Sequence, residues 1–354
     1  MDWAIAGAGV FLIWAALNDV FHAVVVPRPT PSRYRPSALL VRVTWPLWRE
    51  RIVGDGGRRE RRLGTYAPFA TIGLLGMWIA MLITGNGLIF YAIRDQFAPA
   101  LPDIPSATYF AAVSLTTIGY GDILPTGPVA RWLAVTAGIT GLAVVALTIT
   151  YLFTLYGSLE RRELGVTTLD ARAGAPPSGV TLLEQSARAG RVDELSALFE
   201  KWEGWAAHVL DTHLSHPLLA YFRSSHDGES WVSALGALLD AATLVITTIE
   251  GVPRGQAQVM RGIGAHVVED LTQVYGLSYE RESGVERSEF DDAYRGLAEA
   301  GFRLREADAA WADFSATREQ YAAGLNALAR HFAVPPALWI SDRTVLPHRP
   351  SGRS

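Results

Sequence analysis

The sequence contains no cysteine, which excludes disulfide bonds and metal sites with cysteine ligands. It contains a single lysine, Lys201, so arginine carries nearly all of the positive charge. Charged residues make up only 19% of the 354 residues, and the formal net charge of -4 gives no indication of nucleic acid binding. No internal repeat is present, and a chain of this length can form two domains.

The few charged residues are unevenly distributed along the chain. Three long apolar runs cover residues 3–26, 67–93 and 129–156, and each can cross a bilayer core of about 30 Å at about 1.5 Å per residue. The first run lacks the basic start and the small-residue cleavage site of a signal peptide, so we expect an N-terminal transmembrane helix within residues 1–26. The sequence therefore predicts an all-α membrane protein with three transmembrane helices.

The connection between the first two runs, residues 27–66, is rich in arginine. It contains ten arginines and three acidic residues, and such an excess in a short connection predicts a cytoplasmic position. The N-terminus would then lie outside the cell, and the residues after the third run would lie in the cytoplasm. The arginines are not spaced every third residue along an apolar helix, which excludes a voltage sensor.

Within this connection, residues 38–53 mix leucine, valine and tryptophan with arginine. Such a segment can lie in the membrane interface, where its arginines would bind anionic lipid headgroups. A purely topological role for the arginines is the alternative. Pro46 is expected to interrupt the segment, so that it would not form one straight helix.

Three polar residues, Asn18, Asp19 and His22, lie inside the first apolar run. Ionisable groups in a membrane helix usually face protein or water, which makes Asp19 and His22 candidates for a functional role. The alternative is that they lie at the cytoplasmic interface and pair with nearby arginines. The pattern leaves their role open.

The sequence Thr-Thr-Ile-Gly-Tyr-Gly-Asp at residues 116–122 is the main candidate for a functional motif. Two glycines relieve the steric limits on φ and ψ, and a β-branched and an aromatic residue alternate with them. Backbone carbonyls held in a line can replace the water around a dehydrated cation. The motif follows a short apolar segment opened by Asp103, Pro105 and Ser106, a favourable helix start.

This stretch resembles the signature filter of pore-loop potassium channels, in particular bacterial channels with a two-helix pore, here with an extra N-terminal transmembrane helix. The resemblance covers residues 67–157. It implies that potassium ions bind the filter residues Thr117, Ile118, Gly119, Tyr120 and Gly121, through backbone carbonyls and the Thr117 hydroxyl. It further implies support of the filter by Thr116, by Asp122 at its outer end, and by the aromatic pair Tyr109 and Phe110.

The same resemblance implies a homotetramer, because one chain supplies one filter loop. Residues 67–93 would be the outer helix and residues 129–156 the inner, pore-lining helix. Gly138 and Gly141 in the inner helix are either a gating hinge or a site of close packing against the outer helix. Some bacterial channels carry a glutamate at the position of Val113, paired with the aspartate at position 122; without that pair, slow inactivation of this type is not expected.

The C-terminal half has ordinary soluble composition and resembles no known regulatory module. It lacks the glycine-rich βαβ start of a potassium-conductance regulator domain and the strand-rich pattern of a cyclic-nucleotide-binding domain. We expect a flexible linker at 158–179, a helical cytoplasmic domain at 180–340 that modulates opening, and a loose tail at 341–354. The expected helices cover 192–209, a short helix from Pro217, 231–249 (central in the bundle rather than a fourth membrane crossing), 256–275, 290–305 and 308–332.

Histidines concentrate in one part of this domain, at His208, His213, His216 and His226. The spacing of His213 and His216 could bind a metal, and histidines could sense cytoplasmic pH. The alternative is that Ser215 or His216 caps the helix that Pro217 opens. No nucleophile motif or phosphate-binding glycine loop lies nearby, so we expect no enzyme activity. We expect no organic cofactor, and the domain's ligand is open, with protons the first candidate. A sensor or scaffold anchored by its pore and a potassium-transporter subunit are the alternative functions.

Overall fold

The computed structural model describes residues 3–26, 35–52, 57–224, 228–280, 284–335 and 337–340. The chain forms two compact units. The first unit consists of Met1–Arg51 and Thr65–Gly157, and the second of Ile52–Gly64 and Ser158–Ser354. Among the expected segments, the tail at 341–354 and His226 lie outside the described residues.

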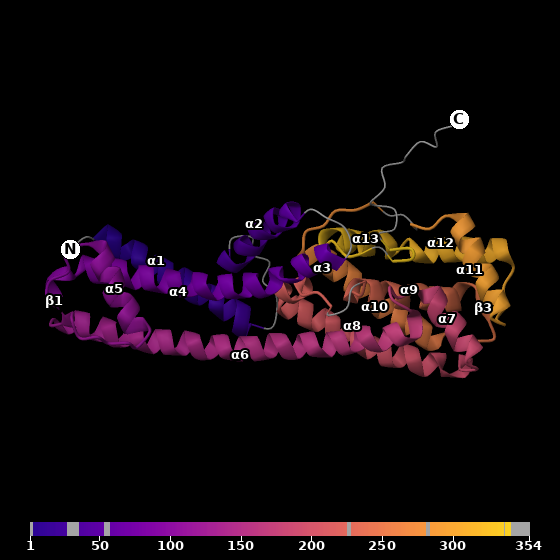
Figure 1. Cartoon of the computed structure of the whole chain (residues 1–354), viewed down its shortest axis with the longest axis horizontal. Helices are drawn as coiled ribbons and strands as arrows, with labels where there is room; N and C mark the ends of the chain where they lie inside the picture. The colour runs from indigo at the N-terminus through magenta and orange to yellow at the C-terminus, as the bar shows by residue number, and fades with distance from the viewer. Residues whose placement is uncertain are drawn as a thin grey trace, which may run out of the picture. The chain divides into compact units, whose positions relative to one another are not determined.

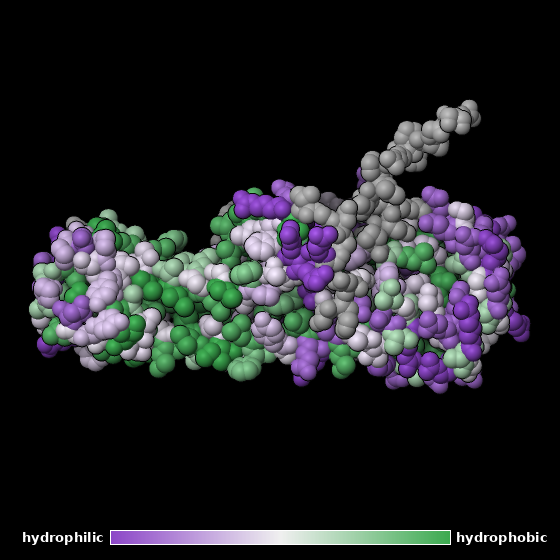
Figure 2. All heavy atoms as spheres, in the orientation of Figure 1, coloured by the Kyte–Doolittle hydropathy of each residue, from purple (hydrophilic) through white to green (hydrophobic). Residues whose placement is uncertain are grey.

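The first unit contains the three long apolar helices that the sequence predicts. The candidate membrane spans are Trp3–Val25, Arg58–Ala92 and Pro128–Ala173, which make this a multi-pass membrane protein. Their cores are α1 (Trp3–Val20), α4 (Tyr66–Ala92) and α6 (Pro128–Ala173), with the short apolar helix α5 (Ile104–Leu115) between α4 and α6 (Figure 1). Apolar residues cover much of the visible surface of these helices (Figure 2).

Helix α1 packs directly on α4 through two glycines. A Cβ on Gly9 would lie 2.5 Å from the Gly85 carbonyl oxygen, and a Cβ on Gly85 would lie 2.8 Å from the Gly9 carbonyl oxygen. The two backbones are therefore in van der Waals contact, as small residues permit in membrane helices. The contact is reciprocal, so any larger residue at either position separates the helices.

Asp19 in α1 is fully buried, and its carboxylate accepts three hydrogen bonds. Trp78 Nε1 of α4 donates to Oδ2 at 2.8 Å, the Ser37 hydroxyl to Oδ1 at 2.7 Å, and the Ser37 amide to Oδ2 at 2.9 Å. Among the described residues, the partners of Asp19 are thus a serine and a tryptophan and not the arginines that the sequence offered as one alternative. His22 lies in a short π-helix (Phe21–Val25) that continues α1. Its Nδ1 is 2.8 Å from the Asn18 carbonyl oxygen of α1.

Helix α2 (Pro36–Arg51) runs through Pro46 without a break, so the expected interruption is wrong. A proline inside a helix removes one backbone hydrogen bond, and packing on both sides of it can offset that loss. Before the proline, the buried Trp45 contacts the Tyr66 ring at 4.9 Å between centroids; after it, Trp48 contacts the same ring at 5.9 Å. The two tryptophans hold both halves of α2 against the start of α4.

Two short strands connect the chain before α5 with the chain after residue 122. Strand β1 (Phe97–Ala98) pairs antiparallel with β2 (Leu124–Pro125). The Gln96 carbonyl accepts the Thr126 amide at 2.8 Å, and the Gln96 side chain accepts the Ala130 amide at 3.2 Å. The start of α6 is thereby tied to the segment that follows α4.

Helix α6 is longer than its apolar run. Its 46 residues span about 70 Å at about 1.5 Å per residue, more than twice a bilayer core of about 30 Å. The expected linker at 158–179 is therefore helical as far as Ala173. Gly174, at a φ of +84°, ends the helix, because this left-handed conformation is easiest for glycine. Helix α7 (Gly179–Arg188) follows, capped by the Ser178 side chain.

The second unit is a bundle of helices around α9 (Trp231–Thr247). Every residue of α9 except Ile246 is buried, which confirms the prediction of a central bundle helix. The prediction placed its end two residues later, at 249. The remaining elements are α3 (Gly57–Gly64), α8 (Leu195–Ser215), α10 (Gly255–Val274), α11 (Arg287–Glu299), α12 (Ala307–Arg318), α13 (Ala322–His331), β3 (Ile249–Glu250) and β4 (Arg303–Leu304).

The two predicted helices nearest the C-terminus also differ from the structure. The single helix expected over 308–332 is two helices, α12 and α13, because the chain turns so that Arg318 and Tyr321 both reach the buried Asp240. Arg318 Nε lies 2.8 Å and the Tyr321 hydroxyl 2.7 Å from Asp240 Oδ1. The helix expected over 290–305 ends at Glu299, and Gly301, at a φ of +100°, turns the chain into β4.

Candidate functional site

Helix α5 positions the candidate filter, and its start follows the predicted pattern. The Asp103 side chain accepts the Ser106 amide at 2.8 Å, and a proline occupies the first turn. The cap satisfies one of the free amides at the helix start, and an acidic side chain there interacts favourably with the helix dipole. Beyond Leu115, the Thr116 hydroxyl donates to the Ala112 carbonyl at 2.7 Å and keeps the chain close to the helix end.

The backbone of the filter alternates in handedness. Thr117, Gly119 and Gly121 have φ angles of +59°, +62° and +80°, whereas Ile118 and Tyr120 between them do not have positive φ. In an extended strand successive carbonyls point to opposite sides, but alternating left- and right-handed residues turn successive carbonyls toward one side. Within the residues that the structure describes, no hydrogen bond ends on the carbonyl oxygens of residues 117–120.

The amide groups of the filter point back to the end of α5. The Thr117 amide donates to the Ser114 carbonyl at 3.1 Å, and the Ile118 amide donates to the Val113 carbonyl at 2.9 Å. The Gly119 amide is 3.4 Å from the same Val113 oxygen. The amides of the filter thus bond to carbonyls at the end of α5, while the carbonyl oxygens of residues 117–120 accept no hydrogen bond from the described residues. Unpaired carbonyls in one column are suited to binding a dehydrated cation.

Glycine is needed in the filter for its torsion angles rather than for space. A Cβ on Gly119 or Gly121 would meet no atom of this chain within 4 Å, but both residues have positive φ. An L-residue in that region carries strain of about 1–3 kcal/mol. Thr117 also has positive φ although it is not a glycine. The hydrogen bond from its amide to the Ser114 carbonyl helps to hold it in this conformation.

The two aromatic residues of α5 have different surroundings. The Tyr109 hydroxyl donates to Asp122 Oδ2 at 2.9 Å, so it holds the residue directly after the filter. Phe110 is buried, and its ring centroid lies 5.2 Å from that of Phe90 in α4 and 5.0 Å from that of Phe97 in β1. The partner of Asp122 is therefore a tyrosine, where a glutamate at position 113 would stand in some bacterial channels.

The two glycines of α6 are not equivalent. A Cβ on Gly141 would overlap the Leu115 carbonyl oxygen at the end of α5, whereas a Cβ on Gly138 would lie 3.5 Å from the Ser114 carbonyl oxygen, an ordinary contact. Close packing therefore involves Gly141 and the short helix before the filter, and the expected outer-helix partner is wrong. Helix α6 continues through both glycines.

The histidine cluster is spread over the end of α8, which runs to Ser215 rather than to residue 209. His213 is fully buried; its Nδ1 lies 2.8 Å from the Val209 carbonyl oxygen, and its Nε2 lies 3.4 Å from Arg162 Nη1. Burial lowers the pKa of His213 well below its usual value, and the charge of Arg162 adds to this effect. Burial also lowers the pKa of His216.

A metal site at His213 and His216 finds no support in the geometry. Among the described residues there is no group of three side chains that could hold a metal ion. His216 precedes a short 3-10 helix (Pro217–Tyr221), but its side chain makes no capping hydrogen bond, so that predicted role is wrong for His216.

The chain from Pro217 to Ser224, which we call the 217–224 segment, binds the C-terminal part of α6. Arg162 of α6 is fully buried and donates to the Leu219 carbonyl at 2.9 Å and to the Phe222 carbonyl at 2.7 Å. Trp205 Nε1 of α8 donates to the Arg162 carbonyl at 3.0 Å and packs against Gly165. Sequence reasoning did not single out Arg162, although an arginine at the end of an apolar helix was a signal.

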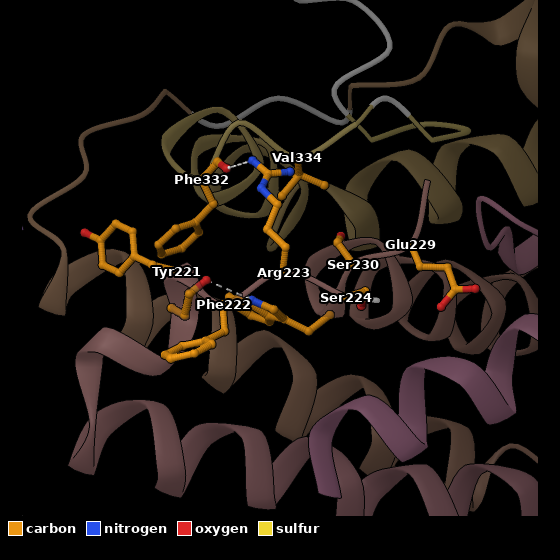
Figure 3. Close-up of a pocket in the computed structure, with 10 residues that line it drawn as sticks. Tyr221, Phe222, Arg223, Ser224, Glu229, Ser230, Phe332 and Val334 are labelled. Atoms are coloured by element: carbon orange, nitrogen blue, oxygen red, sulfur yellow. Dashed lines mark hydrogen bonds between the residues drawn. The ribbon is translucent and has the colours of Figure 1, made fainter. Parts of the chain in front are cut away.

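The same segment also binds α3 and the end of α13. Arg223 forms an ion pair with Glu60 of α3 and donates to the carbonyls of Phe332 at 2.6 Å and Ala333 at 2.8 Å. Figure 3 shows Arg223 reaching the Phe332 carbonyl beside a small pocket that Tyr221 and Ser230 also line. One short segment therefore holds both α3, which precedes the outer helix, and the end of α6.

Residues 76–157, which include the filter, match the family model described as an ion channel. The delayed-rectifier potassium channel regulatory subunit KCNS2 of Mus musculus is 30% identical over 105 residues, 29% of this chain and 22% of that protein. KCNS3 of Rattus norvegicus, a subunit with the same description, is 32% identical over 93 residues, 26% of this chain and 19% of that protein.

A third relative, the potassium voltage-gated channel subfamily A member 2 of Xenopus laevis, is 31% identical over 93 residues, 25% of this chain and 19% of that protein. The chain thus spans about a fifth of the length of the curated relatives it matches. No solved structure matches the chain significantly. Residues 76–157 therefore match an ion channel family rather than an enzyme family, and they are distantly similar to the pore regions of potassium channels.

Proposed function

We propose that this protein is a potassium-selective channel that conducts K⁺ passively across the cell membrane. The observation that carries the proposal is the filter backbone, in which alternating handedness leaves the carbonyls of residues 117–120 without hydrogen-bond partners. Such carbonyls replace the hydration shell of K⁺ in potassium filters. In this proposal residues 117–121 bind the ions. The filter is supported by Thr116, Tyr109, Phe110 and Asp122.

The proposed assembly is a homotetramer in which four filter loops surround one axis. Ile118 and Tyr120 are 53% and 69% exposed in the single chain, which is unusual for apolar side chains beside a buried helix end. Neighbouring copies would cover them and would complete the ion-binding column. K⁺ is the only cofactor in this proposal.

For the orientation, we propose an external N-terminus, a re-entrant α5 with the filter on the outer side, and a cytoplasmic C-terminal domain. The excess of arginine over acidic residues in the 27–66 connection supports a cytoplasmic connection. That connection would meet membrane lipid, including anionic lipid.

We further propose that the helical domain at 180–340 modulates opening. The support is the 217–224 segment. It contacts the C-terminal part of α6 through Arg162, and it contacts helix α3 through Arg223. A ligand that prefers one arrangement of this segment by a few kcal/mol would shift the open fraction. The proposal assigns no identity to this ligand. Gly138 and Gly141 remain candidates for a gating hinge in α6.

Potassium flux from purified protein in liposomes tests the proposal. We expect K⁺ flux with little Na⁺ flux, and we expect Gly119→Ala to abolish K⁺ flux while the tetramer remains, because alanine at a φ of +62° is strained. Gly73→Ala in α4 is the matched control, since its Cβ would meet no atom within 4 Å at an ordinary helical position. A wild-type protein without flux would favour a sensor or scaffold. A conducting Gly119→Ala variant would refute the filter assignment. A monomer that conducts on its own would indicate a transporter subunit.

A further inference from the structure

One face of α2 exposes three large aliphatic side chains, Leu39, Val43 and Leu47, which we call the α2 stripe. They are 47%, 50% and 49% exposed. Because they are four residues apart, they lie within an arc of about 80° at about 100° per residue. The opposite face carries the buried Trp45 and the Thr44 hydroxyl, which is 3.0 Å from the Tyr66 hydroxyl. The part of the chain that the structure describes leaves the α2 stripe open to its surroundings.

Arginines border the α2 stripe on both sides. On a helix of about 100° per residue, Arg42 and Arg49 lie along one border, and Arg51 lies beyond the other. Arg42 and Arg51 are exposed, and the single acidic residue of α2, the exposed Glu50, lies on the same face as the stripe, just beyond Leu47 near the end of the helix. Figure 2 shows hydrophilic and hydrophobic residues adjoining over α2. An apolar strip between guanidinium groups is suited to a surface with acyl chains beneath and anionic groups above.

Helix α2 also adjoins a membrane-spanning surface. Trp48 of α2 contacts Phe69 of α4, with 5.8 Å between ring centroids. Phe69 and Ile72 of α4 are 59% and 66% exposed, and α4 belongs to a candidate membrane span. Helix α2 therefore lies beside the start of a helix whose surroundings are lipid. This position favours lipid over a soluble protein as the occupant of the stripe.

We propose that α2 is a lipid-binding helix that lies in the headgroup region of one leaflet. Leu39, Val43 and Leu47 contact acyl chains there, and Arg42 and Arg51 bind the phosphates of anionic phospholipids. The inference rests on the proposed membrane placement of the connection, and it does not depend on K⁺ selectivity. It assigns the lipid contacts to named side chains of α2, where the sequence indicated only an interfacial segment at residues 38–53 with a topological role as the alternative.

The absence of cysteine makes a direct test possible. The full-length Val43→Cys protein is labelled with an environment-sensitive fluorophore and placed in liposomes with phospholipids spin-labelled near the headgroup. We expect severalfold stronger quenching than for Arg295→Cys, the matched control in α11, where the side chain is 71% exposed. Equal quenching at both positions overturns the proposal. Disulfide-linked dimers of Val43→Cys would also overturn it, because a second copy would then cover the stripe.

The charge recognition is tested with the double variant Arg42→Gln/Arg51→Gln carrying the same label at position 43. Energy transfer to fluorescent phosphatidylglycerol is compared with transfer to fluorescent phosphatidylcholine. The preference for the anionic lipid should fall by about fivefold per arginine removed, and Arg295→Gln should leave it unchanged. An unchanged preference in the double variant overturns the phosphate assignment. Quenching needs no conduction, so K⁺ flux without quenching refutes this inference alone, and quenching without flux refutes the proposed channel alone.

Discussion

Replacing Gly141 by alanine tests whether α6 is packed by its backbone on the helix that carries the filter. The added Cβ would overlap the Leu115 carbonyl oxygen and lie 2.9 Å from Leu115 Cγ. Leu115 is the last residue of α5, two residues before Thr117. A backbone carbonyl cannot rotate away as a side chain can, so α6 and α5 must separate. Gly138→Ala adds the same methyl group three residues earlier in an ordinary contact at 3.5 Å.

The two substitutions should therefore have opposite effects. Overpacking costs about 1–3 kcal/mol, and Gly141→Ala should be at the upper end because the nearest atoms belong to the Leu115 backbone carbonyl. Gly138→Ala should be neutral or stabilising by up to about 1 kcal/mol, because alanine is the better helix former. We expect Gly141→Ala to lower the thermal midpoint of the detergent-solubilised protein and to reduce K⁺ flux in liposomes.

The result that would refute this reasoning is a Gly141→Ala protein with wild-type midpoint and flux. If both variants keep wild-type stability and both change the open probability in single-channel recordings, a hinge at the two glycines explains α6 better than packing does. The pair thus separates the two interpretations of these residues that the sequence left open.

Three further predictions follow from contacts in the two units. Gly9→Ile should reduce the yield of monodisperse protein, because the reciprocal Gly9–Gly85 contact has no room for a side chain; Gly7→Ile, with no atom within 4 Å of its Cβ, should not, and equal yields would contradict the packing. Arg162→Met should destabilise the second unit by about 3 kcal/mol in chemical denaturation, since it leaves buried carbonyls without donors; the exposed neighbour, as Arg161→Met, is the control. Acid should also destabilise this unit. Burial lowers the pKa of His213, so the folded state binds fewer protons than the unfolded state, whose histidine titrates near about 6.5. The contribution of His213 to the free energy of unfolding is complete above that pH. It is lost as the pH falls toward the pKa of His213 in the folded state, by about 1.4 kcal/mol per pH unit. Thermal unfolding at pH 7.5 and 5.5 measures the difference, and an undiminished pH dependence in His213→Phe would show that other groups cause it.

The parts of the structure that sequence reasoning predicted are those with local causes. Apolar run length predicts the three long helices, Asp103 with Pro105 predicts the start of α5, and the glycines of the filter mark the positions with positive φ. Each of these depends on residues within a few positions of one another. The filter's ion-binding role stays a prediction until flux is measured.

The parts that could not be predicted depend on partners far away in sequence. Asp19 meets Trp78 across 59 positions, Gly141 meets the carbonyl of Leu115, and Asp240 draws Arg318 and Tyr321 together so that one apolar pattern becomes two helices. Periodicity indicates which face of a helix is apolar, but it does not identify what that face meets. The linker expected at 158–179 failed for the same reason, since contacts made by Arg162 keep the chain helical.

The hydrogen bonds of Asp19 have a consequence for the order in which the membrane part of the chain assembles. Helix α2 receives its N-terminal capping acceptor from α1, and the same carboxylate needs the indole of Trp78 in α4 as a further donor. During synthesis α1 and Ser37 of α2 emerge before Trp78, so the carboxylate lacks its indole donor until α4 has been inserted. The final position of α2 is therefore reached only after the second crossing is complete. A shortened protein that begins at α2 would lose this cap, so α1 is an integral part of the membrane fold.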